Sequence, residues 1–331
     1  MTLKLILAFV IAFAVSAVVG FFLVPYLRRI KAGQSIKENG PTWHMSKQGT
    51  PTMGGLMFIA AIAVVCLSVG FECMAEGEYG HLFCLAFALV FGAIGFLDDY
   101  EKLKKKQNLG LTAGKKLLLQ LAAAVAFIFL MRRFGYVALD SLYIPFWNKT
   151  VPVPEPLYVI FAAFVIVGTV NSVNLTDGVD GLAASTTMPV CIFFAVISML
   201  WGERFLSLGV FASGLAGGLL GFLIYNFHPA KVFMGDTGSL FMGGMVCALA
   251  FGMDLPILLL PVGIVYICEI VSVVLQVSYF KATHGKRLFK MSPIHHHFEM
   301  CGWSEVKICG VFGFVSLLGG AVALLCVAFG V

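Results

Sequence analysis

Charged residues are scarce in this sequence. Only 12% of the 331 residues are Asp, Glu, Lys or Arg, against roughly 25% in soluble domains, and 60% are hydrophobic. A soluble fold of this length could not bury that much apolar surface, so we expect the solvent to be lipid. No stretch is long enough for a separate soluble domain. We therefore predict a single membrane domain over residues 1–331, with no nucleic-acid partner.

Paired cysteines with metal-ligand spacing are also missing. The nine cysteines occur singly, mostly in apolar segments, and no CxxC is present. Small apolar filler explains them better than disulfides or a zinc site. The chemistry of this chain therefore has to come from other residue types.

Apolar segments recur from one end of the chain to the other, most of them long enough to cross a hydrocarbon core of ~30 Å, although the third, fourth and eighth are short. Ten are present, at residues 3–24, 54–71, 82–97, 117–131, 156–173, 182–200, 205–225, 238–253, 255–280 and 308–330. The sequence therefore predicts an all-α polytopic membrane protein with ten transmembrane helices. The first segment is longer than the core of a signal peptide and is followed by Arg28 and Arg29, so we expect it to be retained.

Basic residues are unevenly divided between the two sides of these segments. Loops after odd-numbered segments hold 17 of the 22 Lys and Arg residues, and the opposite side holds 5, including Arg132 and Arg133. Cytoplasmic loops are the ones enriched in Lys and Arg. We therefore expect the odd-numbered loops to be cytoplasmic and both termini to be extracytoplasmic.

Carboxylates, amides and histidines gather in the same odd-numbered loops. The segments are HMSKQGTPTMGG with Lys47 and Thr52, GFLDDYEK with Asp98 and Asp99, NSVNLTDGVDGLA with Asn171, Asn174, Asp177 and Asp180, YNFHPAKVFMGDTGSL with Asn226, His228, Lys231 and Asp236, and SPIHHHFE with His295, His296, His297 and Glu299. Because five loops converge on one membrane face, they indicate a shared site.

The Asp98–Asp99 pair directly follows the apolar run FGAIGFL. A solvated helix end would explain an isolated pair of aspartates. At interface depth, however, ionised carboxylates are costly unless they serve a function. Adjacent carboxylates also repel each other, and Mg²⁺ relieves that repulsion while it binds substrate phosphates. Asp236, which follows a glycine in FMGDTGSL, is a further candidate metal ligand.

Several other polar residues allow both a structural and a functional interpretation. NLTDGVDG could be an Asx-rich turn, although its polar side chains are dense for one. Of the three adjacent histidines we expect one or two to contact phosphate and the rest to be structural. Glu269 lies deep in the ninth segment, where it is either functional or satisfied by a neighbouring helix. The glycines of the seventh segment have GxxxG spacing, which predicts close helix packing.

The segments GTPTMGG, FLDDYEK, NLTDGVDGLA, FMGDTGSL and PIHHHFE, in this order, resemble the MraY family of phospho-N-acetylmuramoyl-pentapeptide-transferases. The resemblance runs from about Lys47 to Glu299. The aspartate motifs are shared with the wider superfamily of polyprenyl-phosphate N-acetylhexosamine-1-phosphate transferases, whereas PIHHHFE and GTPTMGG are more specific to this family.

The resemblance implies an Mg²⁺-dependent enzyme of peptidoglycan synthesis in the bacterial inner membrane. Its substrates would be UDP-N-acetylmuramoyl-pentapeptide and undecaprenyl phosphate, and its products lipid I and UMP. The active site would face the cytoplasm. A homodimer is also implied, as is a bent ninth helix beside a lipid groove.

The resemblance also implies roles for individual residues. Asp98 and Asp99 would be the catalytic pair, Asp236 a catalytic Mg²⁺ ligand, and His295 and His296 part of the pyrophosphate region. The substrate-binding residues would be Asn174 and Asp177 for the nucleotide sugar, Asp180 and Lys47 near the uracil, Phe233 stacked on the base, Lys116 of GLTAGKK on a phosphate, and Thr52 and Asn226 lining the site. Within the Asp98–Asp99 pair, we assign the role of base or nucleophile to Asp98. Asp98 lies nearer the apolar run and hence deeper in the membrane interface, where partial desolvation would raise its proton affinity.

Two other functions compete with this one. A sister enzyme that transfers N-acetylglucosamine-1-phosphate to a polyprenyl phosphate would share the aspartates but lack PIHHHFE. A secondary transporter would place its ionisable residues near the bilayer midplane, where Glu269 alone is expected here.

Overall fold

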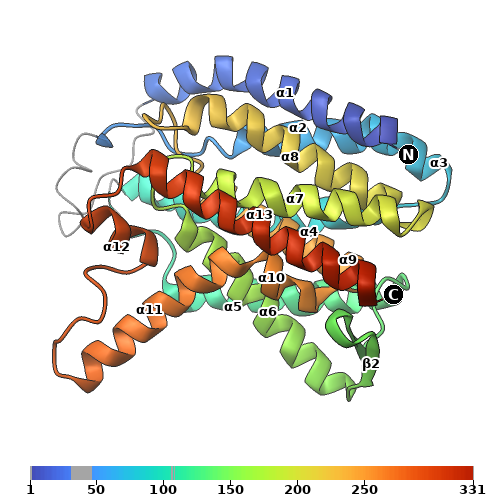
Figure 1. The fold of residues 1–331 in the computed structure, drawn as a ribbon. Helices are drawn as coiled ribbons and strands as arrows, with labels where there is room; N and C mark the ends of the chain where they lie inside the picture. The colour runs from blue at the N-terminus through green and yellow to red at the C-terminus, as the bar shows by residue number, and fades with distance from the viewer. Residues whose placement is uncertain (1, 31–46, 106, 108, 331) are drawn as a thin grey trace.

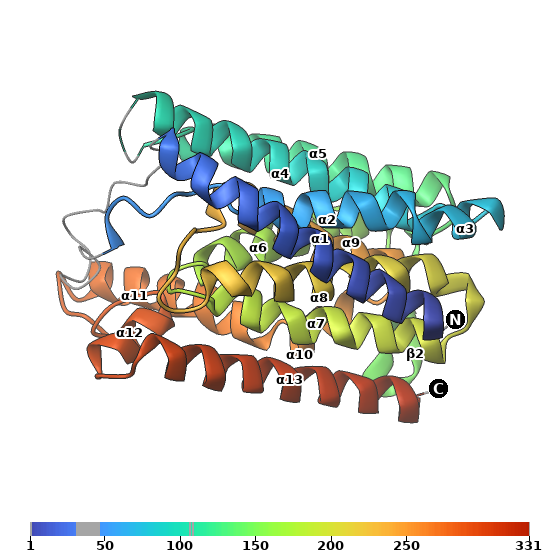
Figure 2. The same ribbon diagram turned by 90° about the horizontal axis from the view of Figure 1, so that it is seen from above.

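Helices make up most of the chain. The computed structural model describes residues 2–30, 47–105, 107 and 109–330. The long helices of the first half are α1 (Thr2–Arg29), α2 (Leu56–Leu67) with its short continuation α3 (Val69–Ala75), α4 (Gly80–Lys105), α5 (Ala113–Arg133) and α6 (Glu155–Thr176). Those of the second half are α7 (Leu182–Leu200), α8 (Leu206–Asn226), α9 (Gly235–Gly252), α11 (Ile264–Ala282) and α13 (Glu305–Gly330). Figure 1 shows α1, α8, α7 and α13 side by side, and Figure 2 shows α4 and α5 on the side opposite α13.

Every predicted apolar segment contains a helix. Within the described ranges, nine helices are long and apolar enough to cross a membrane. They establish a multi-pass, mainly helical protein. The eighth predicted segment corresponds to α9, which is not among the nine. The count of ten spans therefore stays a prediction, and so does the side of the membrane on which the termini lie.

Helix α9 is the most enclosed helix of the bundle. All its residues from Thr237 to Gly252 are buried, and α4 and α6 pack against it. By contrast, only 28% of the most apolar window of α1, α5, α11 or α13 is buried inside the protein. A helix surrounded by protein can carry polar residues and glycines, whereas the outer helices present apolar side chains to lipid. This explains why α9 has the weaker hydrophobic signal.

The glycines of α8 permit close helix packing, as predicted. A Cβ on Gly217 would overlap the carbonyl oxygen of Phe9 in α1, and one on Gly221 would lie 2.7 Å from the carbonyl oxygen of Phe13. Packing against α1 therefore accounts for these two glycines.

The polar segments that were predicted to be loops are largely helix ends. Asp98 and Asp99 lie in the last turns of α4, Asn174 lies in the last turn of α6, and Asp236 lies in the first turn of α9. His295 belongs to a short helix, α12 (Ile294–Met300). The loop prediction was wrong because hydrophobicity marks where a helix leaves the lipid, whereas backbone hydrogen bonding can continue the helix beyond that point.

The all-α prediction is wrong between α5 and α6, and other short elements divide the chain elsewhere. Between α5 and α6, strands β1 (Ser141–Ile144) and β2 (Lys149–Pro152) form an antiparallel hairpin around the 3-10 turn η2 (Pro145–Trp147). The ninth predicted segment is divided into η4 (Pro256–Leu258), α10 (Leu259–Val262) and α11, with a break at Gly263. A further 3-10 turn, η3 (Glu203–Phe205), joins α7 to α8.

The ends of the bundle differ in chemistry. Helices α4, α6 and α8 end, and α9 begins, where the polar motifs meet. Both chain termini lie at the other end, together with the hairpin (Figure 1). The protein therefore has a polar end, which holds the candidate site, and a terminal end.

Candidate active site

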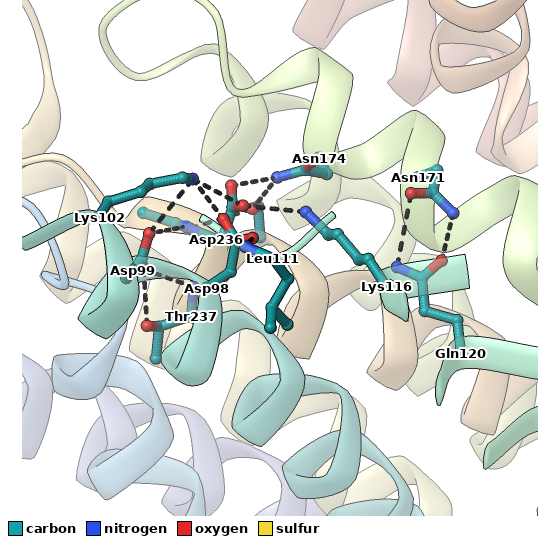
Figure 3. Close-up of polar contacts among 12 residues, drawn as sticks. Asp98, Asp99, Lys102, Leu111, Lys116, Gln120, Asn171, Asn174, Asp236 and Thr237 are labelled. Carbon is teal, nitrogen blue, oxygen red and sulfur yellow. Dashed lines mark hydrogen bonds and ion pairs between the residues drawn. The ribbon is translucent and has the colours of Figure 1, made fainter. Parts of the chain in front are cut away.

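Three carboxylates meet where the end of α4 lies against the start of α9. Asp98, Asp99 and Asp236 each offer an oxygen atom, and these atoms lie within 4.8 Å of one another. Gly95, one turn before the pair, makes this approach possible because a Cβ there would overlap the backbone carbonyl of Asp236. The sequence prediction that these residues share a site is consistent with this arrangement (Figure 3).

Asp99 is bound to the N-terminus of α9. Its carboxylate accepts hydrogen bonds from the backbone N–H of Asp236 at 3.2 Å, from the N–H of Thr237 at 2.9 Å and from the hydroxyl of Thr237 at 2.7 Å. The first backbone N–H groups of a helix lack partners within the helix, and its N-terminus favours negative charge. Asp99 therefore holds α9 against α4.

Asp236 is surrounded by donors from three other helices. The ammonium groups of Lys102 and Lys116 lie 3.0 and 2.9 Å from its Oδ2, and the amide of Asn174 donates to its Oδ1 at 2.9 Å. Asn174 also donates to the hydroxyl of Ser239 at 2.7 Å, which orients the amide. These contacts bring Lys116, Asn174 and Asp236 together (Figure 3).

Asp98 has different partners from its neighbour. Its Oδ1 accepts from the backbone N–H of Leu111 at 2.8 Å, and its Oδ2 lies 2.5 Å from the ammonium of Lys102. Lys102 is thus shared between Asp98 and Asp236. Its place in the site could have been found from sequence, because it follows Asp98 by four residues on the same helix face.

The three carboxylates fit a magnesium ion. Mg²⁺ takes oxygen ligands, and it uses one or two carboxylates together with substrate phosphates rather than a complete protein cage. The side chain of Asp236 is 18% exposed, whereas those of Asp98 and Asp99 are 5% and 4% exposed. Asp236 is therefore the carboxylate most open to an ion and to a phosphate.

A second charged cluster joins α13 to the segments before α2 and α7. The ammonium of Lys47 lies 2.8 Å from the carboxylate of Asp180 and 2.6 Å from that of Glu305. His228 Nδ1 lies 3.0 Å from Asp180. Burial alone would lower the pKa of Lys47, but hydrogen bonds to the two carboxylates raise it on balance. Lys47 is therefore a permanent cation at this position.

Glu305 is a residue that sequence reasoning missed. It accepts from Lys47 and, at 2.8 Å, from the backbone N–H of Asp180. No local signal points to it, since it is 258 positions from Lys47 and begins an ordinary apolar helix.

Three further predicted residues hold the loops between the clusters. Asn226 accepts from the N–H of Gly181 at 3.1 Å and donates to the carbonyl of Val232 at 2.9 Å. The backbone of half-buried Phe233 pairs with the segment before α2, donating to Pro51. Thr52 is buried, and a Cβ on Gly235 would lie 2.6 Å from its hydroxyl oxygen.

Asp177 lies between the two clusters, just after α6. Burial raises the pKa of Asp177 to about 8, and the negative charges of Asp236, Asp99 and Asp180 add to the effect. A carboxyl with this pKa is largely protonated at neutral pH. It can therefore donate a hydrogen bond to an anionic or carbonyl oxygen.

The two predicted histidines have separate surroundings. His295 Nδ1 lies 3.0 Å from a carboxylate oxygen of Glu269, and both side chains are fully buried. His295 Nε2 faces Gly178, where a Cβ would overlap the ring, so the glycine is required for this approach. His296 Nδ1 lies 2.5 Å from Glu299. Glu269, which the sequence left open, thus has a partner in α12.

Comparisons with known proteins agree with this geometry. Residues 81–254 match the family model described as glycosyl transferase family 4, and residues 47–59 match phospho-N-acetylmuramoyl-pentapeptide-transferase signature 1. A relative from Caldanaerobacter subterraneus subsp. tengcongensis, named phospho-N-acetylmuramoyl-pentapeptide-transferase, is 46% identical over 95% of this chain and 96% of its own length. The chain belongs to this family.

Two more relatives of the same name extend the match over nearly the whole chain. The one from Staphylococcus aureus is 45% identical over 96% of this chain and 97% of its own length. The one from Listeria monocytogenes serotype 4b is 42% identical over 98% of both. The resemblance inferred from the five motifs is therefore confirmed, and the protein is a multi-pass membrane transferase of this family.

Proposed function

We propose that this chain transfers phospho-N-acetylmuramoyl-pentapeptide from its UDP conjugate to undecaprenyl phosphate, giving lipid I and UMP for peptidoglycan synthesis. The observation that carries the proposal is the pairing of three carboxylates with two ammonium groups at one end of the bundle. Family membership supports the choice of substrates, since the relatives carry the name of this transferase.

The reaction joins two anions, so charge must be neutralised where they meet. An oxygen of the lipid phosphate attacks the β-phosphorus of the UDP conjugate, and the bond from that phosphorus to the bridging oxygen breaks with its electron pair leaving on UMP. Lys102 and Lys116 stand beside Asp236, where they can contact the phosphate oxygens. Asp98 accepts the proton of an acceptor phosphate that arrives protonated.

Asp236 is the residue that we propose holds Mg²⁺, with phosphate oxygens supplying most other ligands. The ion would stabilise the negative charge that spreads over the phosphate oxygens in the transition state. Asp99 would keep Asp236 in place, because its carboxylate accepts a hydrogen bond from the backbone N–H of Asp236.

The second cluster supports the binding of the nucleotide. Lys47 and Asp180 present a donor and an acceptor side by side, which suits the edge of uracil, and Phe233 lies near the same loop. Asn174 and Asp177 would bind the nucleotide sugar, and Thr52 and Asn226 would line the site. His295 and His296 would contact the pyrophosphate region.

Substrate choice separates this proposal from the sister enzyme. Purified protein in detergent is supplied with undecaprenyl phosphate, Mg²⁺ and either UDP-N-acetylmuramoyl-pentapeptide or UDP-N-acetylglucosamine, and the lipid product is identified by mass spectrometry. We expect product from the first nucleotide alone. Product from UDP-N-acetylglucosamine alone would assign the sister activity.

We further propose that the protein works as a homodimer in the bacterial plasma membrane, with the polar end in the cytoplasm. The bias of 17 basic residues against 5 supports this orientation. Exposed apolar side chains along the outer helices offer surface for both lipid and a second copy. Cross-linking in native membranes should trap a dimer, and a monomer under the same conditions would contradict it.

A further inference from the structure

A cavity lies at the terminal end of the bundle, away from the candidate active site. Its volume is about 400 Å³, and its walls come from the turn after α5, strand β1, the turn between α7 and α8, and the turn after α9. The side chains that line it include those of Tyr136, Tyr143, Trp201, Arg204, Phe205 and Asp254. Helix α9 has 18 residues and carries Asp236 in its first turn, so the cavity beyond its other end is about 27 Å from the acidic cluster.

The aromatic side chains alone would need no ligand. Tyrosine and tryptophan are common at the two membrane interfaces, where one edge of the ring meets lipid and the other meets water. Such a belt explains Tyr136, Tyr143 and Trp201 as anchors. It does not explain a carboxylate among them.

The position of Asp254 is unfavourable for an ionised carboxylate that has no cation beside it. It follows the C-terminus of α9, where the helix dipole disfavours negative charge, and its backbone is in the left-handed region with φ +56°. Burial raises the pKa of Asp254 to about 6, so it is mostly ionised at neutral pH. Within the described part of the chain, its carboxylate forms no hydrogen bond or ion pair. An ionised group in this position calls for a cation.

Arg204 supplies the opposite charge but does not pair with Asp254. Its guanidinium lies 5.4 Å from the centre of the Phe205 ring, an arrangement that holds it by a cation–π interaction. Among the side chains that the structure describes, its N–H donors have no hydrogen-bond acceptor. Guanidinium groups bind phosphate in a bidentate manner, with two parallel N–H···O hydrogen bonds. The cavity therefore offers an anion for a cation, a cation for a phosphate, and aromatic walls.

We propose that this cavity binds the headgroup of an amine-bearing phospholipid, with the ammonium against Asp254 and the aromatic rings and the phosphate against Arg204. Its volume is within the range of small-molecule sites, about 300–1,000 Å³. It lies at one end of a membrane-spanning bundle, which is where lipid headgroups lie. The site does not depend on the proposed transferase activity.

Lipid binding to the detergent-purified full chain tests the proposal. Native mass spectrometry compares dioctanoyl-phosphatidylethanolamine with dioctanoyl-phosphatidylglycerol, which has the same chains and a phosphate but no amine. We expect the first to bind with an apparent Kd at least about tenfold lower. This corresponds to about 1.4 kcal/mol. Equal affinities would overturn the proposal.

Variants locate the site. Asp254→Asn should remove the preference for phosphatidylethanolamine, and Arg204→Gln should weaken both lipids. Matched controls at the same end, Asp140→Asn and Arg133→Gln, should change neither. Arg204 is exposed, so its variant tests the cavity even where Asp254→Asn fails to fold. A wild-type lipid preference in Asp254→Asn, or unchanged binding in Arg204→Gln, would contradict the assignment.

A third ligand distinguishes the source of the headgroup. Glycerophosphoethanolamine has the headgroup without acyl chains, and we expect it to bind far more weakly than the lipid. If it binds as tightly, the site is one for a soluble phosphoamine and the lipid assignment is wrong. All four variants should keep wild-type transferase turnover, so this test and that of the proposed function fail independently.

Discussion

Adjacent aspartates have different surroundings in this protein. Asp99 is saturated by three donors from the start of α9, whereas Asp98 has one backbone donor and a lysine that it shares with Asp236. Neighbours on a helix point about 100° apart, so the two cannot serve one reactant equally. We expect Asp98 to act on the acceptor phosphate and Asp99 to support the structure around the metal ligand.

Asparagine substitution separates the two roles. Asp98→Asn should lose at least about 100-fold in turnover, with near-normal binding of nucleotide substrate and Mg²⁺. Asp99→Asn should also be impaired, and it should in addition lose about 1–3 kcal/mol of stability, because an amide group would face the donors of α9. Turnover, calorimetric titration and thermal unfolding of both variants measure this. Lost binding in Asp98→Asn with intact binding in Asp99→Asn would reverse the assignment.

Asp236 gives a metal-dependent prediction. Asp236→Asn keeps an oxygen but loses the charge, so turnover should fall about 100-fold or more, and the Mg²⁺ concentration for half-maximal rate should rise. Glu101→Gln, an exposed carboxylate on α4, is the control and should titrate like wild type. A folded Asp236→Asn variant with wild-type turnover in limiting Mg²⁺ would show that the metal ligand lies elsewhere.

We expect Glu269 to act as a positioning residue for His295, whose Nδ1 lies 3.0 Å from its carboxylate. Glu269→Gln retains an acceptor for Nδ1 but removes the negative charge, and we expect turnover to fall about 10- to 100-fold with little change in thermal stability. A purely structural role predicts the reverse: lower stability with turnover per folded molecule unchanged. Cys268→Ala, at an exposed neighbouring position of α11, is the control and should change neither.

At the element scale, the contact between α4 and α9 decides whether the site assembles. Gly95 is the point of closest approach, since a Cβ would overlap the backbone of Asp236. Backbone atoms of two long helices cannot shift as a side-chain end can. The spacing of these helices therefore sets the distance between Asp99 and the N–H groups that it binds.

Gly95→Ala should push the two helices apart. We expect a loss of about 1–3 kcal/mol in stability from overpacking and a large loss of turnover, because all three carboxylates depend on this contact. Gly114→Ala, in the first turn of α5 with no atom within 4 Å of the added Cβ, is the matched control and should be neutral or slightly stabilising. Thermal unfolding and turnover compare the two. Equal behaviour of the two variants would disprove the steric argument.

At the scale of the whole molecule, the orientation in the membrane determines which compartment supplies the nucleotide. The basic bias supports our proposal that the polar end faces the cytoplasm, where UDP conjugates are made. The structure places both termini at the other end (Figure 1).

Cysteine labelling tests this orientation. On a cysteine-free background, a thiol introduced at Lys104 should be protected from a membrane-impermeant reagent in intact cells, whereas one near Glu78 should react. Both should react after the cells are broken, which is the control. Labelling of the first from outside as readily as the second would invert the topology and contradict a cytoplasmic active site.

Much of this molecule could be predicted from its sequence. The bilayer requires every backbone polar group to be satisfied within the segment, so a long apolar run has to be helical. Ten such runs were found in this way, and each contains a helix. Asp98, Asp99 and Asp236 could be selected because carboxylates beside apolar runs are costly, and because their motifs are shared by a superfamily of phosphosugar transferases.

Only the tertiary structure showed which of these residues contact one another. Local hydrophobicity predicted neither the burial of α9, which depends on the helices around it, nor the helical continuation of α4 through Asp98 and Asp99. The contact of Glu305 with Lys47 joins residues 258 positions apart, and that of Glu269 with His295 joins two separate helices. Such contacts depend on how helices cross in three dimensions. The pattern along a single helix specifies which face is apolar, but it does not specify which residue of another helix will meet that face.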